Sequence, residues 1–167
     1  MNYVAHRLLL ALSLCAFALT AAPAMAQGSN LAFGQNAQNS DEPVEVEADS
    51  LAISQNDGTA EFTGNVKMTQ GDLRMTAPRV LVRYAEDQSR IQSLEATGGV
   101  VIVSGEDVAE SERADYDVDA AEIVLSGSVT VVQGQTTLTS ERMTISLDNG
   151  TAVMQGRVRT LLQPGSN

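Results

Sequence analysis

The sequence predicts an all-β protein, an elongated and folded-over sheet built from stacked strand repeats, on three observations. Apolar and polar residues alternate in short runs such as Val44–Ala48, and this period of two is typical of strands. A glycine-centred motif recurs four times between residues 62 and 158, which indicates a repeat architecture. No segment after residue 43 has the apolar spacing of an amphipathic helix.

The first 26 residues have the order of a secretory signal peptide. A short basic region precedes an apolar run over residues 8–22, and residues 24–26 (Ala-Met-Ala) offer a small-x-small cleavage site. We expect cleavage after Ala26 and export of the remaining chain, with an uncleaved anchor as the alternative. Cleavage removes the only Cys and the only His of the chain, so no disulfide can brace the exported protein.

The remaining chain divides by composition. Residues 27–42 are rich in Gly, Asn, Gln, Ser and Ala without periodicity, which predicts a flexible leader. The alternating runs predict a β domain over residues 43–163, followed by a tail of residues 164–167. Within the domain, residues 56–58 (Asn-Asp-Gly) and 148–150 (Asp-Asn-Gly) predict tight turns between strands.

The repeated motif occupies residues 62–66, 96–100, 125–129 and 154–158. In the first three copies a second glycine, which predicts a turn, follows seven residues after the motif glycine, and an arginine follows fifteen residues after it. These arginines are Arg79, Arg113 and Arg142. The motif glycines alternate in step with apolar residues, so we expect them on the inner face, where they bend each layer and leave space inside. They are Gly64, Gly98, Gly127 and Gly156.

Residues 62–66 (Phe-Thr-Gly-Asn-Val), followed by residues 69–71 (Thr-Gln-Gly), resemble the signature of the OstA-like family of lipopolysaccharide-transport proteins. The resemblance covers about residues 43–162 and includes the opening at residues 44–50. It implies a β-jellyroll, also described as a β-taco, that holds the lipid A acyl chains of lipopolysaccharide in an apolar groove. It further implies head-to-tail self-association, LptC-like inner-membrane and LptD-like outer-membrane partners, and no cofactor.

The apolar residues of the inner face are the predicted lipid-binding groove. Their pattern alone fits a dry core as well as an open groove, and the resemblance favours the groove. The predicted groove residues are Phe62, Val66, Met68, Met75, Val100, Ile102, Leu125, Val129, Val131 and Ile145. Strands at the two ends of a repeat array have open edges that pair with other chains unless they are blocked. The predicted partner edges carry Val44, Val46, Leu51, Ile53, Val153 and Val158.

Composition argues against several other functions. A formal net charge of −11 opposes nucleic-acid binding, which needs a basic face. Without His or Cys after cleavage, imidazole and thiol catalysis have no residues, so we expect neither an enzyme nor a metal site. Asp115, Asp117 and Asp119 share one strand face, and we favour a solvated surface over a calcium site because calcium loops need a turn with carbonyl ligands. The repeated arginines either hold lipid phosphates or pair with carboxylates, and the repeat favours pairing.

The sequence therefore predicts a periplasmic lipopolysaccharide-binding transport protein that bridges the inner and outer membranes. The alternative is a structural β-solenoid scaffold that binds protein or polysaccharide by its outer face. A filled interior and indifference to lipid would favour the scaffold.

Overall fold

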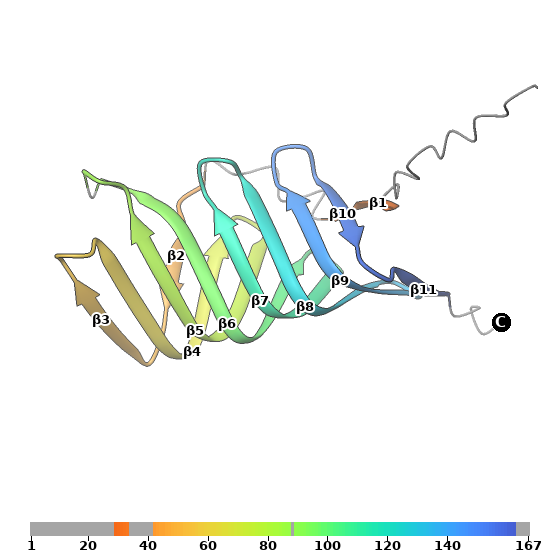
Figure 1. The fold of residues 1–167 in the computed structure, drawn as a ribbon, viewed down its shortest axis with the longest axis horizontal. Coiled ribbons are helices and arrows are strands. Elements are labelled where there is room, and N and C mark those ends of the chain that lie inside the picture. Colours follow the sequence, from red (N-terminus) through yellow and green to blue (C-terminus); the bar gives the residue numbers. More distant parts are fainter. Residues whose placement is uncertain (1–28, 34–41, 88, 163–167) are drawn as a thin grey trace, which may run out of the picture.

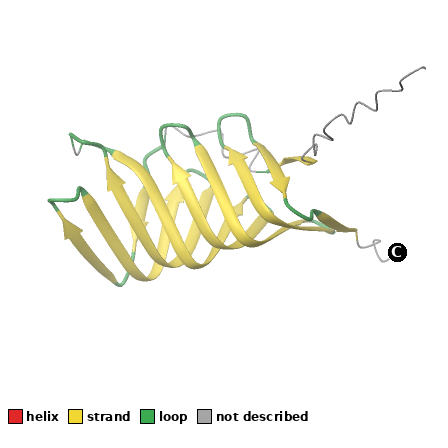
Figure 2. Cartoon of the chain, viewed as in Figure 1, coloured by secondary structure: helices red, strands yellow, loops and turns green. Residues whose placement is uncertain are grey.

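The computed structural model describes residues 29–33, 42–87 and 89–162, and its regular structure is entirely β-strand (Figure 2). The strands are β1 (Ser29–Ala32), β2 (Glu45–Glu47), β3 (Ser50–Ser54), β4 (Thr59–Gln70), β5 (Leu73–Tyr84), β6 (Ile91–Ser104), β7 (Asp107–Asp117), β8 (Glu122–Gln133), β9 (Thr136–Ser146), β10 (Thr151–Gln155) and β11 (Arg159–Leu162). No helix among these residues is long and apolar enough to cross a membrane.

All the strands belong to one antiparallel sheet, in the order β1-β10-β9-β8-β7-β6-β5-β4-β2. At one end, β2 and β3 both pair with β4; at the other, β10 and β11 both pair with β9 (Figure 1). Each consecutive pair from β4 to β9 is joined by a short turn, as the alternating runs and turn signals predict. The predicted all-β, folded-over sheet is confirmed.

Each long strand bends near its middle, and the register shifts there in every pair from β4 to β9. Two residues on an even-numbered strand oppose one residue on the next odd-numbered strand, which is the count of a β-bulge. The bends lie at residues 64–65, 98–99 and 127–128 on β4, β6 and β8, and at residues 78, 112 and 141 on β5, β7 and β9. They divide the sheet into two leaves that face each other.

We call these halves leaf A and leaf B. Leaf A holds the segments of β4, β6 and β8 before their bends and the segments of β5, β7 and β9 after their bends. Its end strands are β3, next to β4, and β10 with β1, next to β9. Leaf B holds the other halves, with β2 and β11 at its ends. The long side opposite the bends, where the two rows of turns lie, is called the mouth.

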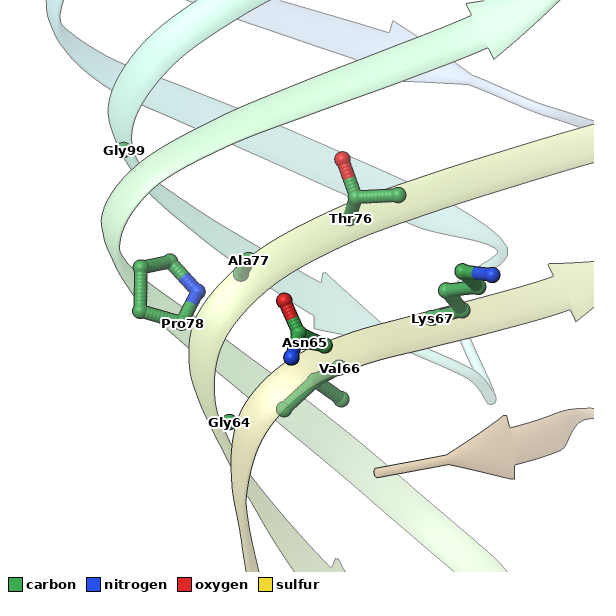
Figure 3. Close-up of a pocket in the computed structure, with 8 residues that line it drawn as sticks. All are labelled: Gly64, Asn65, Val66, Lys67, Thr76, Ala77, Pro78 and Gly99. Carbon is green, nitrogen blue, oxygen red and sulfur yellow. The ribbon is translucent and has the colours of Figure 1, made fainter. Parts of the chain in front are cut away.

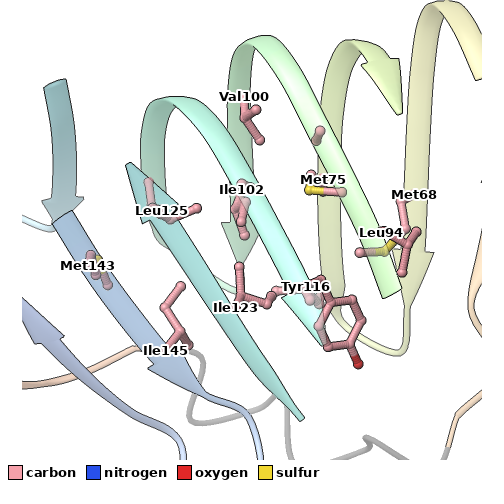
Figure 4. Close-up of a cluster of buried hydrophobic side chains, with 14 of the residues drawn as sticks. Met68, Met75, Leu94, Val100, Ile102, Tyr116, Ile123, Leu125, Met143 and Ile145 are labelled. Atoms are coloured by element: carbon pink, nitrogen blue, oxygen red, sulfur yellow. The ribbon is translucent and has the colours of Figure 1, made fainter. Parts of the chain in front are cut away.

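The apolar core lies between the leaves (Figure 4). On β5 the buried residues are Leu73, Met75 and Ala77 in leaf B and then Val80 and Val82 in leaf A. The alternation of buried residues thus changes phase at the bends of β5, β7 and β9, whereas it keeps its phase across the longer bends of β4, β6 and β8. The core is mainly aliphatic, in keeping with an aromatic content of 4%.

The repeated glycines form the bends, but their predicted position on the inner face is wrong. A Cβ added to Gly127 would lie 2.7 Å from Oε2 of Glu112, an exposed side chain. The corresponding contact of Gly156 is with the exposed Glu141, again at 2.7 Å. Gly127 and the following Ser128 both have positive φ, +79° and +49°, so the strand leaves its normal alternation here. The glycines therefore do not widen the interior.

Gly127→Ala should lower the free energy of unfolding more than Gly134→Ala does. Both glycines have positive φ, +79° and +54°, so both variants carry backbone strain. Only at Gly127 does the new methyl group meet atoms within 4 Å, the nearest belonging to Glu112. We expect an additional loss of about 1 kcal/mol or more, measured by urea unfolding. Equal losses would mean that Glu112 moves aside without cost.

The structure also differs from the prediction before residue 43. Residues 29–32, predicted as part of a flexible leader, form β1 and pair with β10 from Ser29 opposite Met154 to Ala32 opposite Thr151. The next residue, Phe33, is buried. Pairing satisfies backbone groups that β10 would otherwise expose, an advantage that leader composition does not reveal. The predicted signal peptide (1–26) and tail (164–167) lie outside the described residues.

Candidate functional site

The ten predicted groove residues contribute to one apolar interior between the leaves (Figure 4). Nine of them are at most 1% exposed, and the tenth, Phe62, is partly buried near the end formed by β3. The interior is therefore closed to solvent in this structure, whereas the sequence analysis expected an open groove. Any hydrophobic ligand placed there must first separate the leaves.

Sequence reasoning missed part of this lining. Most of the predicted residues lie on the glycine-bearing strands β4, β6 and β8, yet buried residues of these strands were omitted as well as those of the strands between them. The omitted residues include Phe33, Leu73, Val80, Val82, Leu94, Ile123, Leu138, Met143 and Met154. Alternation on β5 and β9 would have found several of them, once the change of phase at the bends of these strands was recognised.

A buried hydrogen bond crosses the mouth between the leaves. The Tyr116 hydroxyl, near the leaf A end of β7, donates to Oε1 of Gln70, at the leaf B end of β4, over 2.7 Å. Gln70 Nε2 in turn donates to the backbone carbonyl of Glu42. Burial raises the pKa of Tyr116, which keeps the phenol neutral and able to donate. Tyr116 thus links the two leaves by a hydrogen bond on the side opposite the bends.

Tyr116→Phe should lower the free energy of unfolding by about 1 kcal/mol, because it removes this bond and leaves the Gln70 amide oxygen without that donor. It should also change the response to alkali. The folded-state pKa of Tyr116 lies above the unfolded value of about 10, so the unfolded chain ionises first and stability falls as pH rises above 10. Urea unfolding at neutral and alkaline pH should show a smaller fall for Tyr116→Phe. An identical fall in both proteins would contradict the assignment.

The outer face is charged and paired. Arg79 Nε lies 2.6 Å from Oε1 of Glu61, and this hydrogen bond lowers the pKa of Glu61. Arg113 pairs with Asp115 at 2.6 Å and with Glu95 at 3.1 Å. These contacts support the structural interpretation of the first two repeated arginines. The third, Arg142, forms no ion pair within 4 Å among the described residues.

The prediction that three aspartates share one strand face is wrong for one of them: Asp115 and Asp117 lie on β7, whereas Asp119 lies in the turn after it. Asp115 pairs with Arg113, Asp119 pairs with Arg90, and Asp117 accepts a hydrogen bond from the backbone N–H of Ala120. All three carboxylates therefore form ion pairs or hydrogen bonds on the surface. No group of three or more His, Cys, Asp or Glu side chains within the described ranges is arranged to hold a metal ion.

Two depressions lie on the outside, over the bends. One, of about 420 Å³, covers the bends of β4 and β5, with Lys67 and Pro78 in its lining (Figure 3). The other, of about 390 Å³, lies over β8 and β9 and has Arg157 and Arg159 in its lining. Of the predicted groove residues, Val66 contributes to the first and Val129 to the second. Both are open surface features and do not lead through the core.

The ends of the sheet expose apolar side chains. On β3, Leu51 and Ile53 are 50% and 67% exposed, and on β11, Leu161 and Leu162 are 60% and 68% exposed. Of the other predicted edge residues, Val44 and Val46 are partly buried at the β2 end, and Val158 is 37% exposed just before β11. Val153 was wrongly placed on an open edge, because Asn30 of β1 pairs opposite it.

Residues 45–151 match the family described as LptA/(LptD N-terminal domain) LPS transport protein. The chain belongs to this family. The match confirms the resemblance drawn from residues 62–71, and within the family the chain is LptA-like. Its family and fold are those of transport proteins.

Two known proteins resemble this LptA-like chain. The crystal structure of LptH, the LptA homologous periplasmic component of the lipopolysaccharide transport device from Pseudomonas aeruginosa, superposes with a TM-score of 0.64. The match covers 76% of this chain and 99% of that one at 19% identity, and it confirms the β-jellyroll fold. "Uncharacterized protein R00383" of Rhizobium meliloti (strain 1021) is 29% identical over 114 residues, which are 64% of this chain. The chain spans 61% of the length of that curated relative.

Proposed function

We propose that this LptA-like protein carries lipopolysaccharide through the periplasm, holding the lipid A acyl chains between its leaves. Copies of the fold, with LptC-like and LptD-like partners at the two membranes, join end to end into a bridge. The observation that carries the proposal is the continuous aliphatic interior between two ends with exposed apolar edges, in a chain of an LPS transport family. No chemical step is involved, so the energy for directed movement comes from elsewhere in the export system.

The closed interior opens by separation of the leaves. Ladder hydrogen bonds among the described strands join neighbours within one leaf, so parting the leaves at the mouth breaks none of them. Apolar packing and the bond between Tyr116 and Gln70 are among the contacts that hold the mouth closed. Each buried methylene of an acyl chain contributes roughly 0.8 kcal/mol. An entering chain therefore replaces the apolar contacts that the leaves lose.

The joint between copies is an antiparallel extension of leaf B. β11 runs from the bend toward the mouth, and β2 runs from the mouth toward the bend. When two copies stand end to end, β11 of one and β2 of the next are antiparallel, as strand addition to a sheet requires. Arg159 and Glu47 both lie on the outward face, since they pair with the outward Thr139 and Lys67. Opposite charges therefore meet across this β11–β2 joint.

The proposal is tested by photo-crosslinking in living cells. A photoreactive residue replaces Ile102, which is fully buried, or Val103, its outward-facing neighbour on β6. We expect a lipopolysaccharide adduct from position 102 and none from position 103. Equal yields, or no adduct from position 102 in a folded and exported protein, would contradict binding between the leaves.

The scaffold alternative is favoured by one observation, the closed interior. A scaffold that binds by its outer face predicts no lipid adduct from position 102 and no effect of lipid on the mouth. The same pair of probes therefore separates the two functions.

A further inference from the structure

The two leaves end differently on the side of β9. In leaf B the last strand is β11, whose four residues are all exposed. In leaf A the edge of β10 is already occupied by β1, a segment from the opposite end of the chain (Figure 1). The described structure thus offers a free edge on one leaf and a covered edge on the other.

β1 runs along β10 in a defined direction. Ser29 lies opposite Met154, close to the Gly156 bend, and Ala32 lies opposite Thr151, close to the mouth. At the other end of the molecule β3 runs the same way along β4, from Ser50 near the bend to Ser54 near the mouth. β1 therefore holds, on β10, the place and direction that β3 of a second copy would take if leaf A continued into that copy.

We propose that β1 is an internal cap that competes with β3 of a second copy for the edge of β10. The inference rests on the proposed end-to-end joint. Contact begins at the free β11–β2 joint of leaf B, and the joint of leaf A forms only when β1 leaves. The capped state is a property of the single copy, and the two-leaf joint is a property of the assembly.

The exchange of β1 for β3 of a second copy both exposes and buries apolar surface. Leaving β10 costs the burial of Phe33, which is 1% exposed and directly follows β1. Docking of β3 from a second copy buries apolar surface in exchange, because Leu51 and Ile53 are 50% and 67% exposed before docking. β3 also has five residues against the four of β1, so it extends the pairing. Free energies of similar size on both sides allow the cap to be displaced by a second copy.

A reversible disulfide tests the proposal on the full chain. Asn30 and Val153 are directly opposite in the register, and opposed residues lie within the Cα separation that a disulfide spans. In Asn30→Cys/Val153→Cys, oxidation locks the cap and reduction frees it, in one protein preparation. By analytical ultracentrifugation we expect the oxidised form to self-associate at least about tenfold more weakly than the reduced form. Circular dichroism should confirm an unchanged sheet.

A second variant acts in the opposite direction. Phe33→Ser removes the buried ring that holds the cap, and we expect self-association about tenfold tighter than in the unmodified chain. If oxidation and Phe33→Ser both leave self-association unchanged while Arg159→Glu weakens it, the cap is overturned and the joint stands. If none of the forms self-associates, the proposed joint fails and the cap fails with it.

Discussion

Val129→Asp should destabilise the fold by about 4 kcal/mol or more, a large fraction of the stability of a domain of this size. Val129 is fully buried on β8, between the leaves, and a carboxylate there leaves water without a charged partner. Thr130→Asp is the matched control, because Thr130 is the next residue on the same strand, faces outward and is partly exposed. We expect a loss of less than about 1 kcal/mol for the control in urea unfolding.

The effect of Val129 on lipid binding needs a gentler substitution. Val129→Thr keeps the branched shape of the side chain and replaces one methyl group with a hydroxyl, at a cost of about 1–3 kcal/mol, well below that of a buried carboxylate. We expect the lipopolysaccharide adduct from position 102 to fall in this variant, because acyl chains then contact a polar group. An unchanged adduct yield in folded Val129→Thr would mean that the lipid does not contact this part of leaf B.

Charge reversal at the β11–β2 joint should abolish most self-association, and the complementary reversal should restore it. Arg159→Glu places like charges at the joint, and so does Glu47→Arg, so each variant alone should associate about tenfold more weakly. In a mixture in which the two variants alternate, Glu at position 159 of one variant faces Arg at position 47 of the other, and the unmodified Arg159 and Glu47 face each other at the next contact. Opposite charges are then restored at both contacts. We expect the equimolar mixture to regain the association of the unmodified chain, measured by analytical ultracentrifugation.

Arg74→Glu controls for net charge. Arg74 is exposed on β5, which β4 separates from the edge strand β2, and its reversal changes the total charge as much as Arg159→Glu does. It should leave self-association close to that of the unmodified chain. Weakening by Arg74→Glu equal to that by Arg159→Glu, or no recovery in the mixture, would show that bulk repulsion and not the joint is being measured.

The strands and their repeat were predictable because a period of two and recurring glycines are local properties of the sequence. The phase of the alternation was not, since the bend of an odd-numbered strand carries no glycine. Glu112 and Glu141 occupy two of these bends, and the repeated Arg113 and Arg142 directly follow them. The arginine repeat was thus a marker of the bends, visible in the sequence but interpreted only as a row of charges.

The sequence predicted which residues line the interior, but not whether that interior is open or closed. Ile102 and Val129 were placed inside because of alternation, and the structure buries both. Whether an interior is filled depends on the distance between the leaves, which long-range packing decides and no local pattern records. β1 was missed for a similar reason, because its partner, β10, lies about 120 residues further along the chain.

The long strands pass from one leaf to the other at the bends, and each glycine-bearing bend has backbone angles that favour glycine, such as +79° at Gly64 and Gly127. Acidic side chains lie over them on the outside: Asp49 accepts a hydrogen bond from Asn65, and Glu141 pairs with Arg157. This line of bends is a hinge between the two leaves. In the proposed end-to-end assembly, the bends of successive copies would lie in one line, and small changes of a few dihedral angles along it would set how far the leaves separate.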